Sequence, residues 1–161
     1  MSYGREIKTG FNSRGVSIIC LIIRILLGGM MLEEGLSKLI SRTFSATDYL
    51  ANSIGPFSGW YASLIPQVPL LNIIVTWAQI LIGLALLLGV LVRLASFFAA
   101  IMMMLFYLAY IPSPLGWLNY QLVYMVLFVG NMFTGVGYFF GLDGLLYKFE
   151  EKKHPLRFLF G

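Results

Sequence analysis

Charged residues, cysteine and histidine are scarce in this sequence of 161 residues. Only 11% of the residues are charged, whereas 59% are hydrophobic, and the mean hydropathy is +0.85. A water-soluble domain normally has about a quarter of its residues charged, so this class is excluded. A composition this apolar is typical of a protein that crosses the membrane several times.

The single cysteine, Cys20, and the single histidine, His154, limit the chemistry that the chain can carry. One cysteine forms neither an internal disulfide nor a dithiol relay. The histidine lies near the C-terminus, so we expect no haem and no metal bound by this chain alone. The net charge of +4 indicates membrane orientation and does not indicate nucleic-acid binding.

Four apolar stretches predict membrane-spanning helices, because roughly 17–25 apolar residues cross a bilayer. The sequence therefore predicts an all-α fold, an integral membrane four-helix bundle that forms one domain over residues 16–144. We expect its helices at residues 16–40, 69–92, 94–110 and 117–140.

The segment 41–68, between the first two of these helices, is predicted to lie on the outer mouth of the bundle. Its two aromatic stretches, Tyr49–Ile54 and Phe57–Ile65, are separated by a Gly-Pro turn signal. We expect two short interfacial helices here, with Trp60 and Tyr61 at the depth of the lipid headgroups.

Lysine and arginine gather on one side of the predicted bundle. Those in the basic arm 1–15, in a turn at Arg93 and in the tail 145–161 outnumber Lys38 and Arg42 on the other side. The positive-inside rule therefore predicts that both termini are cytoplasmic. We expect the tail, which is aromatic and basic, to lie along the cytoplasmic interface.

The first predicted helix carries ionisable residues on a face that also carries two glycines. One helix face is formed by Arg24, Gly28, Met31, Gly35 and Lys38. Ionisable groups are costly inside a bilayer, so we expect this face to point into the protein, where the glycines permit close packing. Glu34 lies at the edge of the face, four residues before Lys38, a spacing that suits an ion pair.

Polar residues on two other helices are placed to meet this face. The helical rise puts Gln79 near the depth of Glu34, and Asn131 and Thr134 in mid-membrane, with Thr134 near the level of Arg24. We predict a polar chamber in the interior. Its outer part would be lined by Glu34, Lys38 and Gln79, and its inner part by Arg24, Asn131 and Thr134.

Simpler explanations of these residues stay open. Gln79 and Asn131 are also explained as interhelical hydrogen bonds. The Glu34–Lys38 pair is also explained as a solvated pair at the outer surface. Arg24 is also explained by hydrogen bonds to carbonyl groups or to a partner subunit.

Motifs in three segments occur together in this chain. They are Arg24-x-x-x-Gly28 with Gly35-x-x-Lys38, Gly83-x-x-Leu86-x-x-Gly89-x-x-x-Arg93, and GYFFGLDGLL at Gly137–Leu146. In this combination the chain resembles the DoxX/DoxD family of small four-helix membrane proteins, over most of the sequence from Ile23 to Leu146. Members often carry a glutamate where this chain has Gln79, so a possible proton-handling carboxylate is absent at that position.

The resemblance implies a membrane subunit of a quinone-linked oxidoreductase complex in the cytoplasmic membrane of a prokaryote. The DoxD branch is the membrane subunit of thiosulfate:quinone oxidoreductase, a respiratory-chain enzyme of sulfur metabolism, and pairs with a small DoxA subunit. Implied partners are therefore quinone, thiosulfate, membrane lipids and a DoxA-like subunit, with no nucleic acid. One alternative is a non-catalytic accessory subunit of a larger respiratory complex such as a terminal oxidase. Another is a small anion transporter. Whether the chain is itself an enzyme is open.

Under this interpretation Arg24, Glu34 and Lys38 are the candidate catalytic residues. Arg24 would stabilise negative charge on a quinone oxygen, and Glu34 would carry the accompanying proton. Lys38 and Arg42 would attract an anion such as thiosulfate. The candidate quinone-binding residues are Arg24, Gln79, Asn131 and Thr134.

Overall fold

Four long helices and three short helical segments make up the part of the chain that the structure, a computed structural model, describes. This part comprises residues 13–41, 44–111 and 116–134. The long helices are α1 (Ser13–Ser41), α4 (Val68–Leu88), α5 (Val92–Ala109) and α6 (Tyr120–Thr134). The short segments are α2 (Thr47–Ala51), α3 (Ser58–Ser63) and the 3-10 helix η1 (Ile65–Gln67). The prediction of an all-α fold is confirmed.

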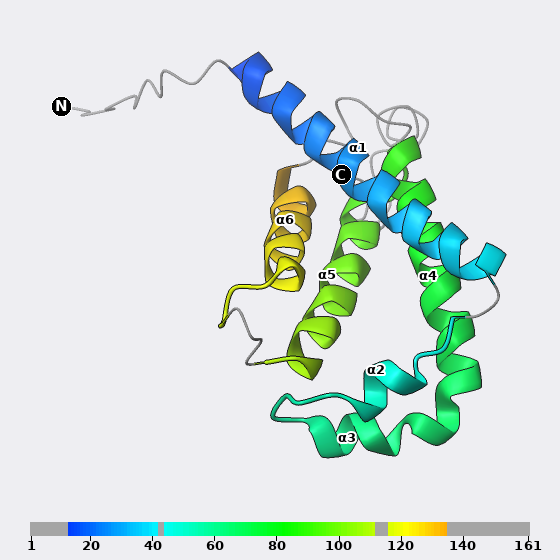
Figure 1. Cartoon of the computed structure of the whole chain (residues 1–161). Helices are drawn as coiled ribbons and strands as arrows, with labels where there is room; N and C mark the ends of the chain where they lie inside the picture. Colours follow the sequence, from blue (N-terminus) through cyan, green and yellow to red (C-terminus); the bar gives the residue numbers. More distant parts are fainter. Residues whose placement is uncertain (1–12, 42–43, 112–115, 135–161) are drawn as a thin grey trace, which may run out of the picture.

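Three of the helical stretches are long and apolar enough to cross a bilayer. They are Gly15–Ser41, Ile65–Leu88 and Val92–Ala109, while α6 is a shorter apolar helix over its described residues. Together they form the expected integral membrane helical bundle, in which α1 runs obliquely to α4, α5 and α6 (Figure 1). The chain is therefore a multi-pass membrane protein.

The bundle is built from two helix pairs. α1 packs chiefly against α4, and α5 chiefly against α6, with fewer contacts between the pairs. Glycines permit the close approach of α1 and α4, as expected from the sequence. A Cβ atom added to Gly83 would lie 2.6 Å from the backbone nitrogen of Leu32, and one added to Gly35 would lie 2.9 Å from the backbone nitrogen of Ile80.

A hydrophobic core joins the two pairs. Phe128 of α6, Met31 of α1, Leu86 of α4 and Val92 of α5 are fully buried in it. This core buries the inner faces of all four long helices against one another, while many apolar side chains on their other faces remain exposed, as expected for helices surrounded by lipid.

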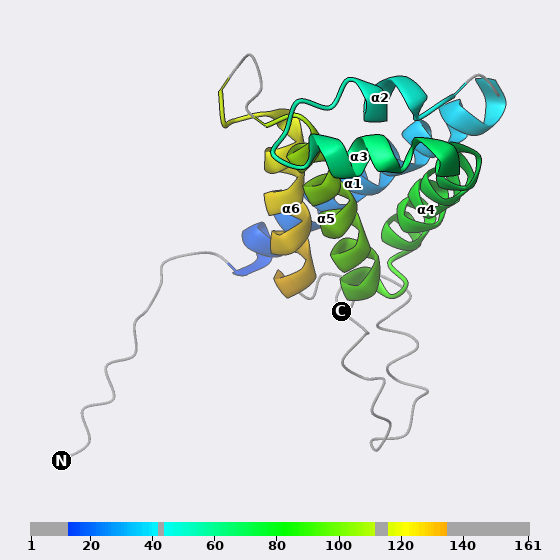
Figure 2. The same cartoon turned by 90° about the horizontal axis from the view of Figure 1, so that it is seen from below.

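The helices α2 and α3, together named the cap, lie at one end of the bundle, here named the capped end (Figure 2). The backbone N–H groups of Ile54 and Gly55 both donate to the carbonyl oxygen of Ala109, at 3.0 Å each, at the end of α5. A Cβ atom on Gly55 would collide with the carbonyl oxygen of Leu108, so only glycine fits here. The two short helices predicted for the segment 41–68 are therefore present and fixed to α5.

Tyr61 is placed differently from the prediction. Its side chain is buried, and its hydroxyl donates to the carbonyl oxygen of Leu105 at 2.6 Å, whereas Trp60 is exposed. Tyr49 does the same with the carbonyl oxygen of Phe106, at 2.8 Å. Both tyrosines therefore hold the cap on α5, and only Trp60 is free to contact the headgroups.

Several helix boundaries differ from the predicted ones. α4 ends at Leu88 and not at residue 92, because Gly89 adopts the left-handed conformation with φ 68°. Arg93 consequently lies in the first turn of α5 and not in the connecting turn. α1 begins at Ser13, within the predicted arm, and α6 begins at Tyr120, three residues after the predicted start at residue 117.

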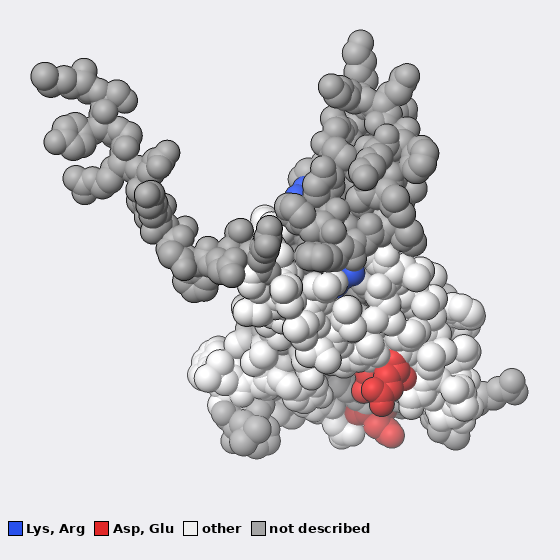
Figure 3. Space-filling model, turned by 90° about the horizontal axis from the view of Figure 1, so that it is seen from above, with Lys and Arg blue, Asp and Glu red and all other residues white. Residues whose placement is uncertain are grey.

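Acidic side chains are few in the described part of the chain. The described acidic residues are Glu33 and Glu34, near the C-terminal end of α1, and Asp48 in α2. Figure 3 shows acidic atoms gathered at one place, apart from the few visible basic atoms, with uncharged surface between them.

Several predictions fall outside the described residues, namely those for the arm 1–12, Arg42, residues 135–144 with the Gly137–Leu146 motif, and the tail 145–161.

Candidate functional site

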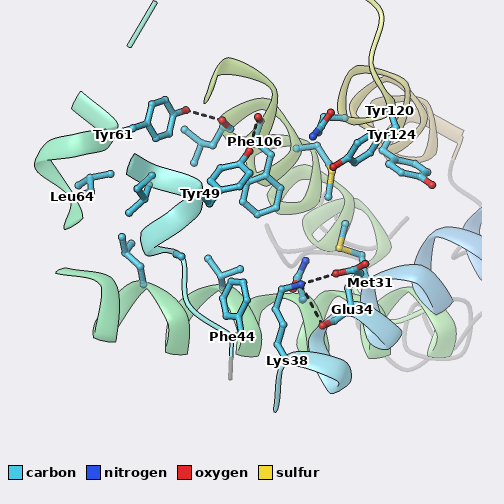
Figure 4. A pocket seen from close by; sticks show the side chains of 18 of the residues that line it. Met31, Glu34, Lys38, Phe44, Tyr49, Tyr61, Leu64, Phe106, Tyr120 and Tyr124 are labelled. Atoms are coloured by element: carbon cyan, nitrogen blue, oxygen red, sulfur yellow. Dashed lines mark hydrogen bonds and ion pairs between the residues drawn. The ribbon is translucent and has the colours of Figure 1, made fainter. Parts of the chain in front are cut away.

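A cavity of about 560 Å³ lies between the two helix pairs at the capped end. Met31 and Met103 belong both to its wall and to the hydrophobic core, so the core forms the floor of the cavity. The cap contributes Tyr49 and Tyr61 on another side (Figure 4). Half of the lining residues are aromatic or methionine, including Met30, Phe44, Trp60, Phe106, Tyr120 and Tyr124.

An ion pair from α1 is the charged part of this wall. Lys38 Nζ lies 2.7 Å from Glu34 Oε2 and also donates to the Glu34 carbonyl oxygen at 3.3 Å. Figure 4 shows this pair across the cavity from Tyr120 and Tyr124. The Lys38 side chain is 15% exposed and that of Glu34 60%, so the cation is the more enclosed partner.

Two glutamine side chains, one from each helix pair, add neutral polar groups to the wall. Gln79 of α4 is 3% exposed and Gln121 of α6 is 6% exposed. Their Oε1 atoms are buried and have no hydrogen-bond partner among the described residues. An unsatisfied buried polar group costs about 1–3 kcal/mol, so a ligand that donates hydrogen bonds to these oxygens would recover this free energy.

Tyrosine hydroxyl groups of the cap serve as structural donors. Burial raises the pKa of Tyr49, and the neighbouring Tyr110 raises it further. Burial likewise raises the pKa of Tyr61. Both side chains are therefore neutral at physiological pH and keep the proton that they donate to the backbone of α5.

The structure brings together three of the residues selected from the sequence. Glu34, Lys38 and Gln79 all line the cavity, whereas Arg24 and Thr134 do not. Arg24 is buried, with 2% of its surface exposed. Thr134 is exposed, and its hydroxyl donates to the carbonyl oxygen of Asn131, at 3.0 Å, within its own helix.

Asn131 takes part in a contact between helices and does not line the cavity. Its Nδ2 atom donates to Ser96 Oγ of α5 at 2.8 Å, and both side chains are buried. Its Oδ1 atom has no hydrogen-bond partner in the part of the chain that the structure describes. The inner and outer residues of the predicted polar chamber therefore do not share this cavity.

Gln121 and the tyrosines of the wall were not selected from the sequence. Gln121 is the second residue of α6 and lies at the capped end, whereas only mid-membrane residues of this helix were considered. An amide side chain among apolar residues in a predicted membrane helix could have indicated this position as a polar contact. The wall tyrosines Tyr49 and Tyr61 lie in the connection, where aromatic residues alone indicate a membrane interface.

Metal ligands do not cluster at this site. Within residues 13–41, 44–111 and 116–134, no group of three or more His, Cys, Asp or Glu side chains is close enough to hold a metal ion.

Comparison with known families finds one match. The family model described as DoxX matches residues 19–112, which is more than half of the chain. The matched range includes Glu34, Lys38 and Gln79 but not Gln121. Neither the curated proteins nor the solved structures contain a match to this chain.

Proposed function

The chain belongs to the DoxX family, and we propose that it is a membrane subunit of a quinone-linked oxidoreductase complex. The quinone head group binds, in this proposal, in the cavity at the capped end. The observation that carries the proposal is the pair of buried amides, Gln79 and Gln121, whose Oε1 atoms have no hydrogen-bond partner among the described residues, in a wall that is otherwise mainly apolar or aromatic. Such a wall suits a flat apolar ring that has polar groups at its edges.

The chemistry of the donor set fits this head group. A quinone ring carries two oxygens that only accept hydrogen bonds, and in the reduced form these oxygens also donate. An amide donates through Nε2 and accepts through Oε1, so the unpaired Oε1 atoms suit the hydroxyl groups of the reduced form, and Nε2 suits the oxygens of the oxidised form. The cavity volume of about 560 Å³ lies in the range of small-molecule sites.

The charged groups of the wall supply proton handling. When bound, the quinone accepts two electrons and two protons. The Glu34 carboxylate lines the cavity and is 60% exposed, so it is placed to pass a proton between the cavity and its surroundings. Lys38 Nζ, 2.7 Å away, holds this carboxylate in place.

These roles change the assignment made from the sequence. We propose that Gln79 and Gln121 bind the head group, and that Arg24, Asn131 and Thr134, which lie outside the cavity wall, act in the structure of the bundle. We further propose that a partner subunit, of the DoxA kind in a thiosulfate:quinone oxidoreductase, delivers the electrons. The distribution of lysine and arginine supports a capped end on the outer side of a prokaryotic cytoplasmic membrane.

Binding of a quinone to the purified protein tests the site. The probe is 2,3-dimethoxy-5-methyl-6-decyl-1,4-benzoquinone, titrated against the wild type, Gln79→Leu and Gln121→Leu in lipid nanodiscs. Each variant loses one hydrogen-bonding group, so we expect the dissociation constant to be about tenfold larger. Ligand-free thermal stability should be retained, because leucine removes an unsatisfied amide.

The matched control is Gln67→Leu. Gln67 is exposed in η1 and does not line the cavity, so its variant should bind like the wild type. A wild type that binds no quinone, or cavity variants that bind as the control does, would contradict the proposed site.

Thiosulfate-dependent quinone reduction by the native complex then tests the substrate. Purification inside a large oxidase without bound quinone would favour the accessory role instead.

A further inference from the structure

A second, smaller cavity of about 200 Å³ adjoins the first at the capped end, between α1 and α4. Lys38 and Phe44 line both cavities, so these two side chains form the wall between them. Lys38 Nζ lies 5.2 Å from the centre of the Phe44 ring, in a cation–π contact. The two cavities therefore meet at these two residues.

The two sides of this wall are held unequally. Asn72 Oδ1 accepts the backbone N–H of Ala46 at 2.9 Å, and Asn72 Nδ2 donates to the carbonyl oxygen of Phe44 at 3.3 Å. These bonds fix the backbone of Phe44 to α4. Lys38 is held by its ion pair with Glu34 and by its contact with the Phe44 ring, and both contacts are made at the end of a long, flexible side chain. Lys38 is consequently the part of the wall that can move aside.

The second cavity ends at the lipid-facing surface. Its rim carries Leu39, Ile73 and Trp77, which are 42%, 59% and 50% exposed. These apolar side chains lie on two membrane-spanning helices, so their exposed surface faces lipid. Below the rim the helices close, since Gly35 of α1 packs against Thr76 and Ile80 of α4.

We propose that the second cavity is a subsite for the apolar tail of the ligand whose ring occupies the first cavity. The tail passes between Lys38 and Phe44 and leaves between α1 and α4 into the lipid. This inference rests on the proposed function, because it requires a ring-and-tail ligand in the first cavity. In this arrangement the rim residues Leu39 and Ile73 determine the preference for a ligand with an apolar tail over a ligand without one.

Filling the second cavity tests this assignment with two probes that share one ring. They are 2,3-dimethoxy-5-methyl-1,4-benzoquinone and the same ring with a decyl chain. Ile73→Trp and Leu39→Trp place bulk at the rim from opposite helices, at exposed positions that tolerate substitution. We expect each to weaken binding of the decyl probe about tenfold or more, because an indole ring at the rim would occupy the space that the tail needs. The tail-free probe should bind each variant as it binds the wild type.

The control is Ile74→Trp, because Ile74 is 51% exposed on α4 but lines neither cavity. It should bind both probes as the wild type does. If the rim variants weaken both probes equally, or neither, or if the control matches them, the tail subsite is wrong while the ring site stands. If the wild type binds neither probe, the proposed function itself fails and the tail subsite with it.

Discussion

The ammonium group of Lys38 lies 2.7 Å from the carboxylate of Glu34, one helical turn earlier on α1, and the two partners are enclosed to different degrees. Lys38 is mostly covered and also faces the ring of Phe44, whereas Glu34 is largely exposed. The pair therefore joins the polar part of the main cavity to the wall of the second one. Its energetic value and its chemical value can be separated by mutation.

Glu34→Gln should change stability little and proton-linked turnover strongly. Glu34 is largely exposed, so its ion pair contributes about 0–1 kcal/mol, and the midpoint of thermal unfolding should fall only slightly. If Glu34 carries protons, quinone reduction by the native complex should fall about a hundredfold, the size typical of a lost general acid or base. Glu33→Gln is the control, because Glu33 is exposed and does not line the cavity. Equal activities of the two variants would remove the proposed role of Glu34.

Gly83→Ala should destabilise the bundle. The added Cβ would lie 2.6 Å from the backbone nitrogen of Leu32 and 2.8 Å from its Cα, so α1 and α4 must move apart. Overpacking of this kind costs about 1–3 kcal/mol, to be measured as a fall in thermal stability in detergent. Gly130→Ala on α6 is the matched control, because nothing lies within 4 Å of its added Cβ. A control as unstable as Gly83→Ala would show that the close helix contact is not the cause.

Alkaline pH should loosen the cap through Tyr49. Its pKa is raised in the folded state by burial and by Tyr110, so the stability it contributes is complete below about pH 10, the pKa of an exposed tyrosine, and is lost as pH rises further. Tyr49→Phe should therefore show a smaller loss of unfolding free energy above that pH. At neutral pH the variant loses one hydrogen bond to Phe106, worth about 0.5–1.5 kcal/mol. Tyr107→Phe, which loses a 3.0 Å bond to Trp117 at an exposed place, controls for the missing hydroxyl. A wild type and a Tyr49→Phe variant with parallel alkaline profiles would contradict this account.

The helices were predictable from the sequence because their physical causes are local. A run of apolar residues that is long enough to cross the bilayer is expected to form a helix, because a helix satisfies its backbone hydrogen bonds within one segment. The face of α1 that carries the glycines follows from the helical period. The end of α4 was predicted four residues too late. Gly89 was interpreted only as part of a motif, although a glycine in the left-handed conformation commonly ends a helix.

The site was only partly predictable because it depends on contacts between distant segments. Glu34, Lys38 and Gln79 were selected from depth along single helices, and they do line one cavity. The depth of Arg24 and Asn131 was also considered, but depth does not tell which neighbour a side chain meets. Asn131 meets Ser96, and this contact depends on how α5 packs against α6. Gln121 enters the wall for the same reason, through the packing of two helix pairs.

The hydrogen bond between Asn131 and Ser96 should matter for stability and not for ligand binding. The bond, 2.8 Å long, joins α5 and α6 in the buried interior, and Ser96 is fully buried. Hydrogen bonds between membrane helices contribute about 0.6 kcal/mol on average and up to about 1.7 kcal/mol. A double-mutant cycle of Ser96→Ala, Asn131→Ala and both together, measured by unfolding in detergent, should give a coupling energy in this range.

Quinone titration of the same three variants separates a structural role of Asn131 from a binding role. Asn131 lies outside the cavity wall, so the dissociation constant for the decyl benzoquinone should stay within about twofold of the wild type, a difference of less than about 0.5 kcal/mol. Gln121→Leu, on the same helix but inside the wall, provides the positive control for lost affinity. If Asn131→Ala weakened binding as much as Gln121→Leu while Ser96→Ala did not, Asn131 would be a ligand-binding residue. The cavity would then have to extend along α6 beyond the hydrophobic core, which now forms its floor.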